Sequence, residues 1–232
     1  MLEQELQLER NLFFFLNGSE SVYWDYFFWL YSYKWTWIPF YLCFIFVFIY
    51  KKNWKEILLM ILSVVLLIVL CDQISSGFFK PFFHRFRPTH HPDFKDQVDI
   101  VLGYQGGLYG FISGHATNAF GFATFFALVF RNRLFTILIL LFAFFNGYSR
   151  IYLGVHFISD VVAGTLTGIA LGYIVYKLYR LSRKKILEMD QAALKNPIYS
   201  KREIYSLCSV YIASILILLL FNNQLVNLFY DK

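Results

Sequence analysis

Residues 57–79 read ILLMILSVVLLIVLCDQISSGFF, and Asp72 is the only charged side chain among them. The run matches the roughly 20 apolar residues that an α-helix needs to cross the hydrocarbon core of a bilayer. Across the 232 residues, 58% are hydrophobic and 16% are charged, whereas a soluble domain carries about 25% charged residues. This composition predicts an all-α, polytopic membrane helix bundle and excludes disordered, collagen-like and coiled-coil chains.

Further apolar runs lie on both sides of this segment, and we expect about six transmembrane helices in a single domain, residues 1–232. Residues 1–20 alternate charged and apolar side chains, which indicates an interfacial amphipathic helix on the membrane surface. The aromatic residues 23–33 are expected either in the headgroup layer or dipping inward, ahead of a bundle that covers residues 35–221. The predicted spans are Trp35–Tyr50, Ile57–Phe79, Ser113–Phe130, Leu134–Asn146, Phe157–Tyr179 and Ile204–Phe221.

The basic residues indicate the sidedness of the chain. Most of the 21 Lys and Arg lie within residues 51–55, 131–133 and 177–202, which six spans place on one face of the membrane. By the positive-inside rule that face is cytoplasmic, so residues 80–112 and 147–156 and both termini face outward. The net charge of +6 follows from this topology, and no nucleic-acid partner is expected.

The cysteines and the N-terminus add two expected absences. Cys43, Cys71 and Cys208 lie inside apolar runs, so they form neither a disulfide framework nor a paired metal motif. Residues 1–10 carry three glutamates and no basic n-region, which argues against a cleaved signal peptide.

Three short polar strings occur at the outward connections and the adjoining helix ends. Each is weak alone, because a cation beside a span is usually an interfacial anchor and a lone histidine is usually structural. Together they supply three cations, two histidines, a carboxylate and a helix start. The strings are Lys80-x6-Arg87-Pro88, Ser113-Gly114-His115 and Ser149-Arg150-x5-His156-x3-Asp160.

These residue types fit a phosphate monoester. Lys80, Arg87 and Arg150 can bind phosphate oxygens, two of them as bidentate guanidinium groups. Ser113 and Gly114 begin a predicted helix, whose free N–H groups attract anions. Without a bound anion the cations would need carboxylate partners, and Asp93, Asp96 and Asp99 in the same loop offer that alternative.

The two histidines suggest acid and nucleophile roles. His156 and Asp160 are four residues apart, so they share one helix face and the carboxylate can orient the imidazole. His156 would attack phosphorus, His115 would protonate the leaving oxygen, and the cations would stabilise the equatorial oxygens. No metal or other cofactor is expected, because the cations supply the electrostatic stabilisation.

The three strings resemble the signature of the type 2 phosphatidic acid phosphatase family, which shares its active site with the vanadium haloperoxidases. The resemblance extends from Lys80 to Asp160, and Ile112 departs from it by standing where the family usually has proline. It implies a bacterial-type membrane phosphatase working through a phosphohistidine. The implied catalytic residues are His156, His115 and Asp160, and the implied phosphate-binding residues are Lys80, Arg87, Ser113, Gly114 and Arg150.

The expected substrate is a lipid phosphate or pyrophosphate, because a lipid headgroup reaches a site at the membrane surface by lateral diffusion. Within the resembled family, undecaprenyl pyrophosphate is favoured, followed by lipid A, with phosphatidylglycerophosphate and phosphatidic acid also open. The predicted location is the plasma (inner) membrane with the active site on the periplasmic side, and the oligomeric state is left open. The alternatives are a lipid phosphotransferase and a non-enzymatic phospholipid-binding or transport protein.

Four other features receive structural interpretations. Asp72 is expected to brace the phosphate site, and His84, His90, His91 and Asp93 are read as a solvated loop because they lack helical ligand spacing. Glycines between Gly103 and Gly110 suggest a flexible flap over the site. Gly164, Gly168 and Gly172 form a close-packing stripe along one helix.

Overall fold

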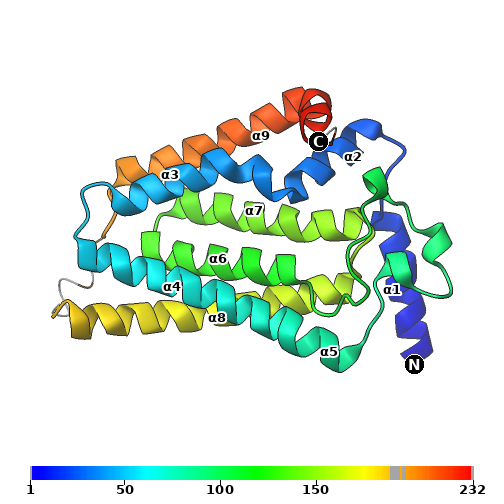
Figure 1. The fold of residues 1–232 in the computed structure, drawn as a ribbon, viewed down its shortest axis with the longest axis horizontal. Coiled ribbons are helices and arrows are strands. Elements are labelled where there is room, and N and C mark those ends of the chain that lie inside the picture. The colour runs from blue at the N-terminus through cyan, green and yellow to red at the C-terminus, as the bar shows by residue number, and fades with distance from the viewer. Residues whose placement is uncertain (1, 189–193, 195–196, 231–232) are drawn as a thin grey trace.

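The computed structural model describes residues 2–188, 194 and 197–230, with the side chains of residues 2–6 left out (Figure 1). Helices make up nearly all of the described chain, and strand pairing in it is limited to one isolated bridge between Phe86 and Tyr109. The helices are α1 (Leu2–Leu16), α2 (Val22–Ser32), η1 (Lys34–Trp37), α3 (Ile38–Ile49), α4 (Trp54–Asp72), η2 (Gln73–Phe79), α5 (Lys80–Phe83), η3 (Pro88–His90), η4 (Lys95–Gln97), η5 (Val101–Gly103), α6 (Gly114–Phe130), α7 (Arg133–Tyr152), α8 (Ile158–Ile186) and α9 (Lys201–Tyr230).

The long helices lie side by side, with α6 in the middle of the bundle (Figure 1). α6 packs against α8, α7 and α4, whereas α2 and α3 pack against α9. Phenylalanines of α6, including Phe125 and Phe126, are fully buried. The span predicted for residues 113–130 is therefore the central element of the fold.

The glycine stripe of α8 explains how closely α8 approaches α6. A Cβ atom at Gly164, Gly168 or Gly172 would come within 3.0 Å of a backbone carbonyl oxygen of α6 or its N-cap. Small residues in such stripes let helix backbones approach inside a membrane. The prediction of a packing stripe is confirmed, and its outermost glycine, Gly164, rests on the carbonyl of Ser113.

The described residues include four helices that are long and apolar enough to cross a membrane, or five if a bent helix pair counts as one span. α6 is slightly shorter, with 17 residues. Each of the six predicted spans thus corresponds to a helix or a helix pair, and the prediction of a multi-pass helical bundle is confirmed. The four long segments are Trp54–Phe83, Arg133–Tyr152, Ile158–Ile186 and Lys201–Tyr230.

The first span begins earlier than the predicted Trp35. The aromatic lead-in forms α2, which meets the following helix at a bend of 69°. Phe27, Leu30 and Tyr31 of α2 are buried in the hydrophobic core. α2 packs against α7 and α9, so the lead-in is part of the helix bundle, whereas Tyr23 and Trp24 at its start are exposed; its depth relative to the headgroup layer stays a prediction.

Several predicted ends were wrong, most clearly that of the fourth span. α7 does not stop at Asn146 but continues to Tyr152, so only a short turn separates it from α8. Polar side chains occur in this last part because they have hydrogen-bond partners: Ser149 Oγ donates to the carbonyl of Asn146, and Arg150 bonds to Ser32 of α2 and to Tyr104 of the 84–113 connection. The segment expected to be an outward loop, residues 147–156, is therefore largely helical.

α8 and α9 also extend beyond the predicted ends, and α9 is kinked at Phe221.

The connections sort to the two ends of the bundle as predicted from the charges. The 50–53 and 131–132 connections and residues 187–188 and 197–200 lie at one end, and the 84–113 connection and the α7–α8 turn lie at the other, with the start of α1 and the end of α9 (Figure 1). α1 runs across this second end, roughly perpendicular to the bundle (Figure 1). The second long span reaches the same end through η2, a π-helical segment placed between α4 and Lys80.

Candidate active site

His156 and Asp160 form a buried pair at the turn from α7 to α8. His156 Nδ1 lies 3.4 Å from Asp160 Oδ2, and the two residues are 1% and 0% exposed. The same carboxylate oxygen accepts a hydrogen bond of 3.0 Å from the backbone N–H of Phe157, the N-cap of α8. Asp160 therefore closes the first turn of its own helix and faces the imidazole, so that Nε2 is the nitrogen left for chemistry.

Arg87 lies against that nitrogen. Its Nη1 is 3.2 Å from His156 Nε2 and donates to the carbonyl of Val155 at 3.1 Å. Its Nε donates to the carbonyl of Tyr109 at 3.2 Å. The backbone between Arg85 and Arg87 pairs with residues 108–110, which fixes the direction of the guanidinium.

Arg150 is almost completely buried near the end of α7, with 2% of its surface exposed. Nη2 donates to the hydroxyl of Tyr104 at 2.7 Å, and Nη1 bonds to the hydroxyl of Ser32. Its Nε–H has no acceptor in the described chain. A buried guanidinium donor without an acceptor is costly unless a ligand supplies one.

The remaining predicted residues approach from α5 and from the start of α6. Lys80 Nζ donates to Ser76 Oγ at 2.9 Å. Ser113 is the N-cap of α6, and its N–H donates to the carbonyl of Asp160 at 2.9 Å, which joins the second string to the third. Gly114 faces the hydroxyl of Ser75.

His115 differs from His156 in being exposed. It lies within electrostatic range of Arg150, His156, Arg87 and Lys80. The fold therefore brings all eight predicted site residues to one end of the bundle, with the buried histidine held in place and the exposed histidine facing outward.

The alternative that nearby aspartates neutralise the cations is wrong for the described residues. Their ion pairs leave Lys80, Arg87 and Arg150 without a carboxylate within salt-bridge distance. Of the three candidate aspartates, Asp93 is 3.8 Å from His91 and Asp99 lies against Gly18. The site is therefore strongly cationic.

This environment lowers the pKa of His156 well below the usual 6.5. Burial is the main cause, because desolvation disfavours the imidazolium, and Arg87, Arg150, Lys80 and Arg85 act in the same direction. His156 is thus a neutral imidazole at pH 7, the form that a nucleophile requires. Burial and the neighbouring cation of Arg150 also lower the pKa of Arg87 to about 10.

Two residues that the sequence analysis missed also contact the site. Arg85 Nη1 donates to Asp160 Oδ1 at 2.6 Å, and Arg85 Nη2 donates to Glu9 of α1 at 2.8 Å. The extended backbone before Arg87 gave a signal for Arg85, since residues two apart share a face. No local signal exists for Glu9, which lies 76 residues away in the sequence.

The glycine-rich stretch contributes part of the site wall. A Cβ at Gly110 would lie 3.0 Å from Asp160 Oδ2 and 3.5 Å from His156 Nδ1. Gly106, at φ +69°, faces the guanidinium of Arg87. The stretch covers the site as the flap prediction expected, while its flexibility stays a prediction.

The other polar features have the modest roles expected of them. Asp72 acts electrostatically on Lys80 from an exposed position, in line with a bracing role. His91 stacks on Phe94 and His84 lies edge-on to Tyr109. The described residues contain no group of three His, Cys, Asp or Glu side chains arranged to hold a metal ion. Ile112, at the position of the usual proline, is fully buried.

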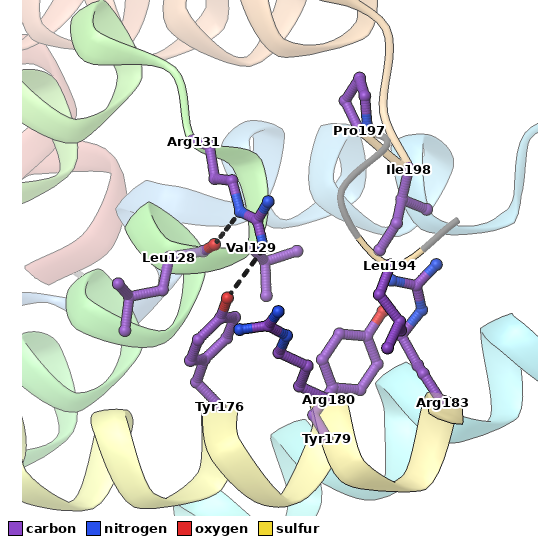
Figure 2. A pocket seen from close by; sticks show the side chains of 10 residues that line it. All are labelled: Leu128, Val129, Arg131, Tyr176, Tyr179, Arg180, Arg183, Leu194, Pro197 and Ile198. Carbon is purple, nitrogen blue, oxygen red and sulfur yellow. Dashed lines mark hydrogen bonds between the residues drawn. The ribbon is translucent and has the colours of Figure 1, made fainter. Parts of the chain in front are cut away.

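Arginines also gather at the opposite end of the bundle, in a pocket between the ends of α6 and α8 and the side chains of Leu194, Pro197 and Ile198 (Figure 2). Arg131 Nη2 donates to the hydroxyl of Tyr176 at 3.0 Å, and Arg131 Nε donates to the carbonyl of Leu128 (Figure 2). Arg183 Nε donates to Glu56 Oε2 at 3.0 Å. Among its described lining residues there is no histidine, and both Arg131 and Arg183 have acceptors in the chain.

The geometry of the catalytic end agrees with a family match. The model described as the PAP2 superfamily matches residues 58–184, more than half of the chain. The chain belongs to the PAP2 superfamily. The matched residues include all three polar strings, so the resemblance predicted from the motifs is confirmed.

Named PAP2 relatives are similar over most of the chain. The lipid A 4'-phosphatase of Porphyromonas gingivalis is 47% identical over 199 residues, which cover 86% of this chain and 84% of that protein. The lipid A 4'-phosphatase of Bacteroides thetaiotaomicron is 37% identical over 177 residues, covering 76% and 79%. With the family match, these relatives make the chain an enzyme, a phosphoric monoester hydrolase of the membrane-embedded PAP2 type.

Two solved structures share the fold. The crystal structure of Aquifex aeolicus LpxE is similar with a TM-score of 0.54 and 32% identity, covering 73% of this chain and 95% of that one. The phosphatidylglycerolphosphate phosphatase structure from Bacillus subtilis has a TM-score of 0.58 at 18% identity, covering 81% and 89%. The second likeness supports the fold alone.

Proposed function

We propose that the protein hydrolyses the phosphate monoester of a membrane lipid, with lipid A as the substrate, through a phosphohistidine at His156. The observation that carries this proposal is the cation cluster around His156: Arg150 has a buried Nε–H without an acceptor, and no carboxylate of the described chain pairs with Lys80, Arg87 or Arg150. A phosphate group supplies the missing negative charge and acceptors.

In the first step, His156 Nε2 attacks phosphorus in line with the bond to the lipid oxygen. The N–P bond forms as the P–O bond breaks, and His115 donates a proton to the departing alkoxide. Arg87 leaves its position against Nε2 and, with Lys80 and Arg150, binds the equatorial oxygens, on which negative charge is concentrated in the transition state. Asp160 stabilises the positive charge that the attacking imidazole acquires.

In the second step, a water molecule attacks the phosphohistidine. His115, now deprotonated, accepts a proton from this water while the N–P bond breaks. Inorganic phosphate leaves, and His156 returns to the neutral form with His115 protonated again. An acceptor alcohol entering in place of water would give phosphotransfer, so product analysis separates the phosphotransferase alternative from hydrolysis.

The choice of lipid A is supported by the relatives at 47% and 37% identity, which are both named lipid A 4'-phosphatases. Undecaprenyl pyrophosphate, favoured by the sequence analysis, has no counterpart among these names. Phosphatidylglycerophosphate is a second candidate, since the phosphatidylglycerophosphatase B of Bacillus subtilis is 28% identical over 138 residues.

The proposed location is the inner membrane with the active site on the periplasmic side. The basic connections lie at the end of the bundle opposite to His156 (Figure 1), and positively charged loops remain in the cytoplasm. Cysteine labelling in intact cells at the 187–200 connection and at the 84–113 connection would test this orientation.

The decisive experiment measures phosphate release by the detergent-solubilised protein in the presence of excess chelator. The substrates are bisphosphorylated lipid A, phosphatidylglycerophosphate, undecaprenyl pyrophosphate and phosphatidic acid, with mass spectrometry to identify the lipid product. We expect release from lipid A that persists with chelator and is abolished in His156→Ala. His91→Ala is the matched control, because the His91 ring stacks on Phe94 in the outer loop and has no side-chain hydrogen bond to His156, Lys80, Arg87 or Arg150 among the described residues.

Each outcome changes the proposal in a defined way. Preferential release from another lipid would replace lipid A as the substrate, and equal activity of His156→Ala would exclude the phosphohistidine. Binding of lipid A by folded wild-type protein without release from any substrate would favour the non-enzymatic alternative.

A further inference from the structure

Asp160 uses its two carboxylate oxygens for different partners. Oδ2 faces His156 and the N–H of Phe157, whereas Oδ1 accepts from Arg85 Nη1 at 2.6 Å. Asp160 is fully buried, so this guanidinium is its cationic partner within salt-bridge distance in the described chain. The direction of the carboxylate, and with it that of the imidazole, depends on where Arg85 lies.

Arg85 is itself held from several sides. Its Nη1 also donates to Ser159 Oγ at 2.6 Å, and its Nη2 donates to Glu9 Oε2 at 2.8 Å. The guanidinium carbon lies 4.4 Å from the centre of the Phe157 ring. Both ends of the planar fork are therefore occupied, in a geometry that a lysine ammonium cannot reproduce.

Glu9 connects this arrangement to α1. Its Oε1 accepts from the backbone N–H of Ser159 at 2.9 Å, in the first turn of α8, while Oε2 binds Arg85. α1 is docked nearby through Phe13, which is fully buried and lies 5.4 Å from the Phe157 ring. One carboxylate of the N-terminal helix thus bridges Arg85 and the start of the helix that carries Asp160.

We propose that Arg85 and Glu9 are positioning residues of the phosphatase, which hold the Asp160 carboxylate against His156 and connect α1 to the active site through Glu9. The proposal rests on the proposed function, because it requires His156 to be the nucleophile. The amphipathic character of α1 indicates a membrane-surface helix, and the Glu9–Arg85 contact gives this helix a second role.

The charges around His156 define a readout that is specific for positioning. The groups facing the imidazole are the cations Arg87, Arg150, Lys80 and Arg85, the second histidine, His115, and the carboxylate of Asp160. Removing the Arg85 cation removes one cause of the lowered pKa of His156 and leaves Asp160 uncompensated. Both changes favour the imidazolium, so the acid limb of the kcat/KM profile moves toward neutral pH.

The experiment compares Arg85→Gln, Arg85→Lys and Glu9→Gln with wild type, using kcat and KM for lipid A across a pH series. For Arg85→Gln we expect kcat to fall about 10- to 100-fold with KM changed by less than about threefold, together with the shift of the acid limb. Arg85→Lys keeps the charge, so the acid limb returns toward that of wild type while kcat recovers only in part. Glu9→Gln loses one charge-assisted hydrogen bond, and we expect a smaller loss, about three- to tenfold.

Arg10→Gln is the matched control for α1. Arg10 follows Glu9 in the same helix and docks it on the 84–113 connection, with Nη2 3.3 Å from Gln97 Oε1 and the guanidinium 4.6 Å from the Phe94 ring. It makes no contact with Asp160 or Arg85 among the described hydrogen bonds and ion pairs. We expect kcat and the acid limb to stay close to those of wild type.

Wild-type kcat and pH profile in Arg85→Gln would overturn the proposal, as would equal losses in Glu9→Gln and Arg10→Gln, since these would indicate only docking of α1. A fall in activity with an unmoved acid limb in Arg85→Gln would reduce Arg85 to a structural role. Failure of the proposed function is distinguishable, because wild type itself would then release no phosphate or His156→Ala would remain active.

Discussion

The two ends of the bundle both concentrate arginines, but they compensate the charge differently. At the end shown in Figure 2, Arg183 is paired with Glu56 at 3.0 Å, and the hydroxyl of Tyr179 also bonds to this carboxylate. At the other end, Arg87 and Arg150 lie near each other and near Lys80, and no carboxylate of the described residues is within salt-bridge distance of them. At the first end the buried Arg183 has its carboxylate within the protein, whereas the three cations at the second end would be compensated by a bound anion.

This difference in charge compensation also separates cations that bind substrate from cations that stabilise the fold. A buried cation that is paired inside the chain is compensated in the folded state. Removal of its partner leaves an uncompensated buried charge, which lowers the free energy of unfolding. A cation whose partner is the substrate stabilises the bound phosphate. The same cation destabilises the folded protein when no substrate is bound. Substitutions of charged residues should therefore lower activity more than stability at the end that contains His156. At the opposite end they should lower stability more than activity.

The largest expected effect is on catalysis, at Arg150. Arg150→Met should lower kcat/KM about 10²- to 10³-fold, because it removes donors that face the transferring phosphoryl group. Thermal unfolding in detergent should change little, since the lost hydrogen bonds to Tyr104 and Ser32 are offset by the removal of a buried charge. Arg180→Met at the opposite end is the control, and an equal loss of activity there would break the comparison.

The next effect is on stability, at Glu56. Glu56→Gln leaves the buried Arg183 without its carboxylate, so the free energy of unfolding should fall by about 3 kcal/mol. Activity per folded molecule should not change. Adding Arg183→Met should restore part of the lost stability, and a Glu56→Gln protein with full stability but impaired catalysis would contradict this assignment.

A smaller effect is expected from the wall of the catalytic end. The Cβ of Gly110→Ala would press on Asp160 and the imidazole of His156, and we expect about a tenfold lower kcat because small displacements of reacting groups are costly. Gly107→Ala provides the control, since nothing lies within 4 Å of its added carbon. Equal kcat values in Gly110→Ala and Gly107→Ala would show that the glycine-rich stretch accommodates the added methyl group without displacing Asp160 or His156.

The smallest effect concerns the partly accessible pair between Lys52 and Glu203, 2.9 Å apart at the basic end. Lys52→Met should lower the free energy of unfolding by about 1 kcal/mol or less, as is usual for ion pairs near a surface. Phosphatase activity should stay at the wild-type value. A loss as large as that of Glu56→Gln would remove the distinction between buried and peripheral pairs.

The candidate catalytic residues could be predicted from the sequence because each motif that contains them is local. The spacing of His156 and Asp160 places both on one helix turn, and Ser113 followed by Gly114 marks a helix start that the structure contains. The apolar runs predicted the bundle in the same way, through length and composition. These signals need only a few neighbouring residues.

What the sequence could not supply depends on contacts between distant segments. Glu9 reaches Arg85 across 76 residues, and no periodicity encodes that meeting. The end of α7 was misplaced because Arg150 is polar, whereas its partners Ser32 and Tyr104 come from other segments of the chain. The sequence motifs do not identify the lipid substrate, because the choice of lipid depends on how its headgroup contacts the outer surface of the folded protein.

The π-helical segment η2 sets the rotational position of Lys80 about the axis of the second span. Its seven residues, Gln73–Phe79, separate the regular helix α4 from Lys80, and wider turns of this kind often occur at functional sites. In a regular α-helix each residue advances the direction of the side chains by roughly 100°. Deleting one residue here would shorten the span only slightly but would rotate Lys80 away from the proposed phosphate site, so under the proposed function the length of this segment is constrained by the site more than by membrane thickness.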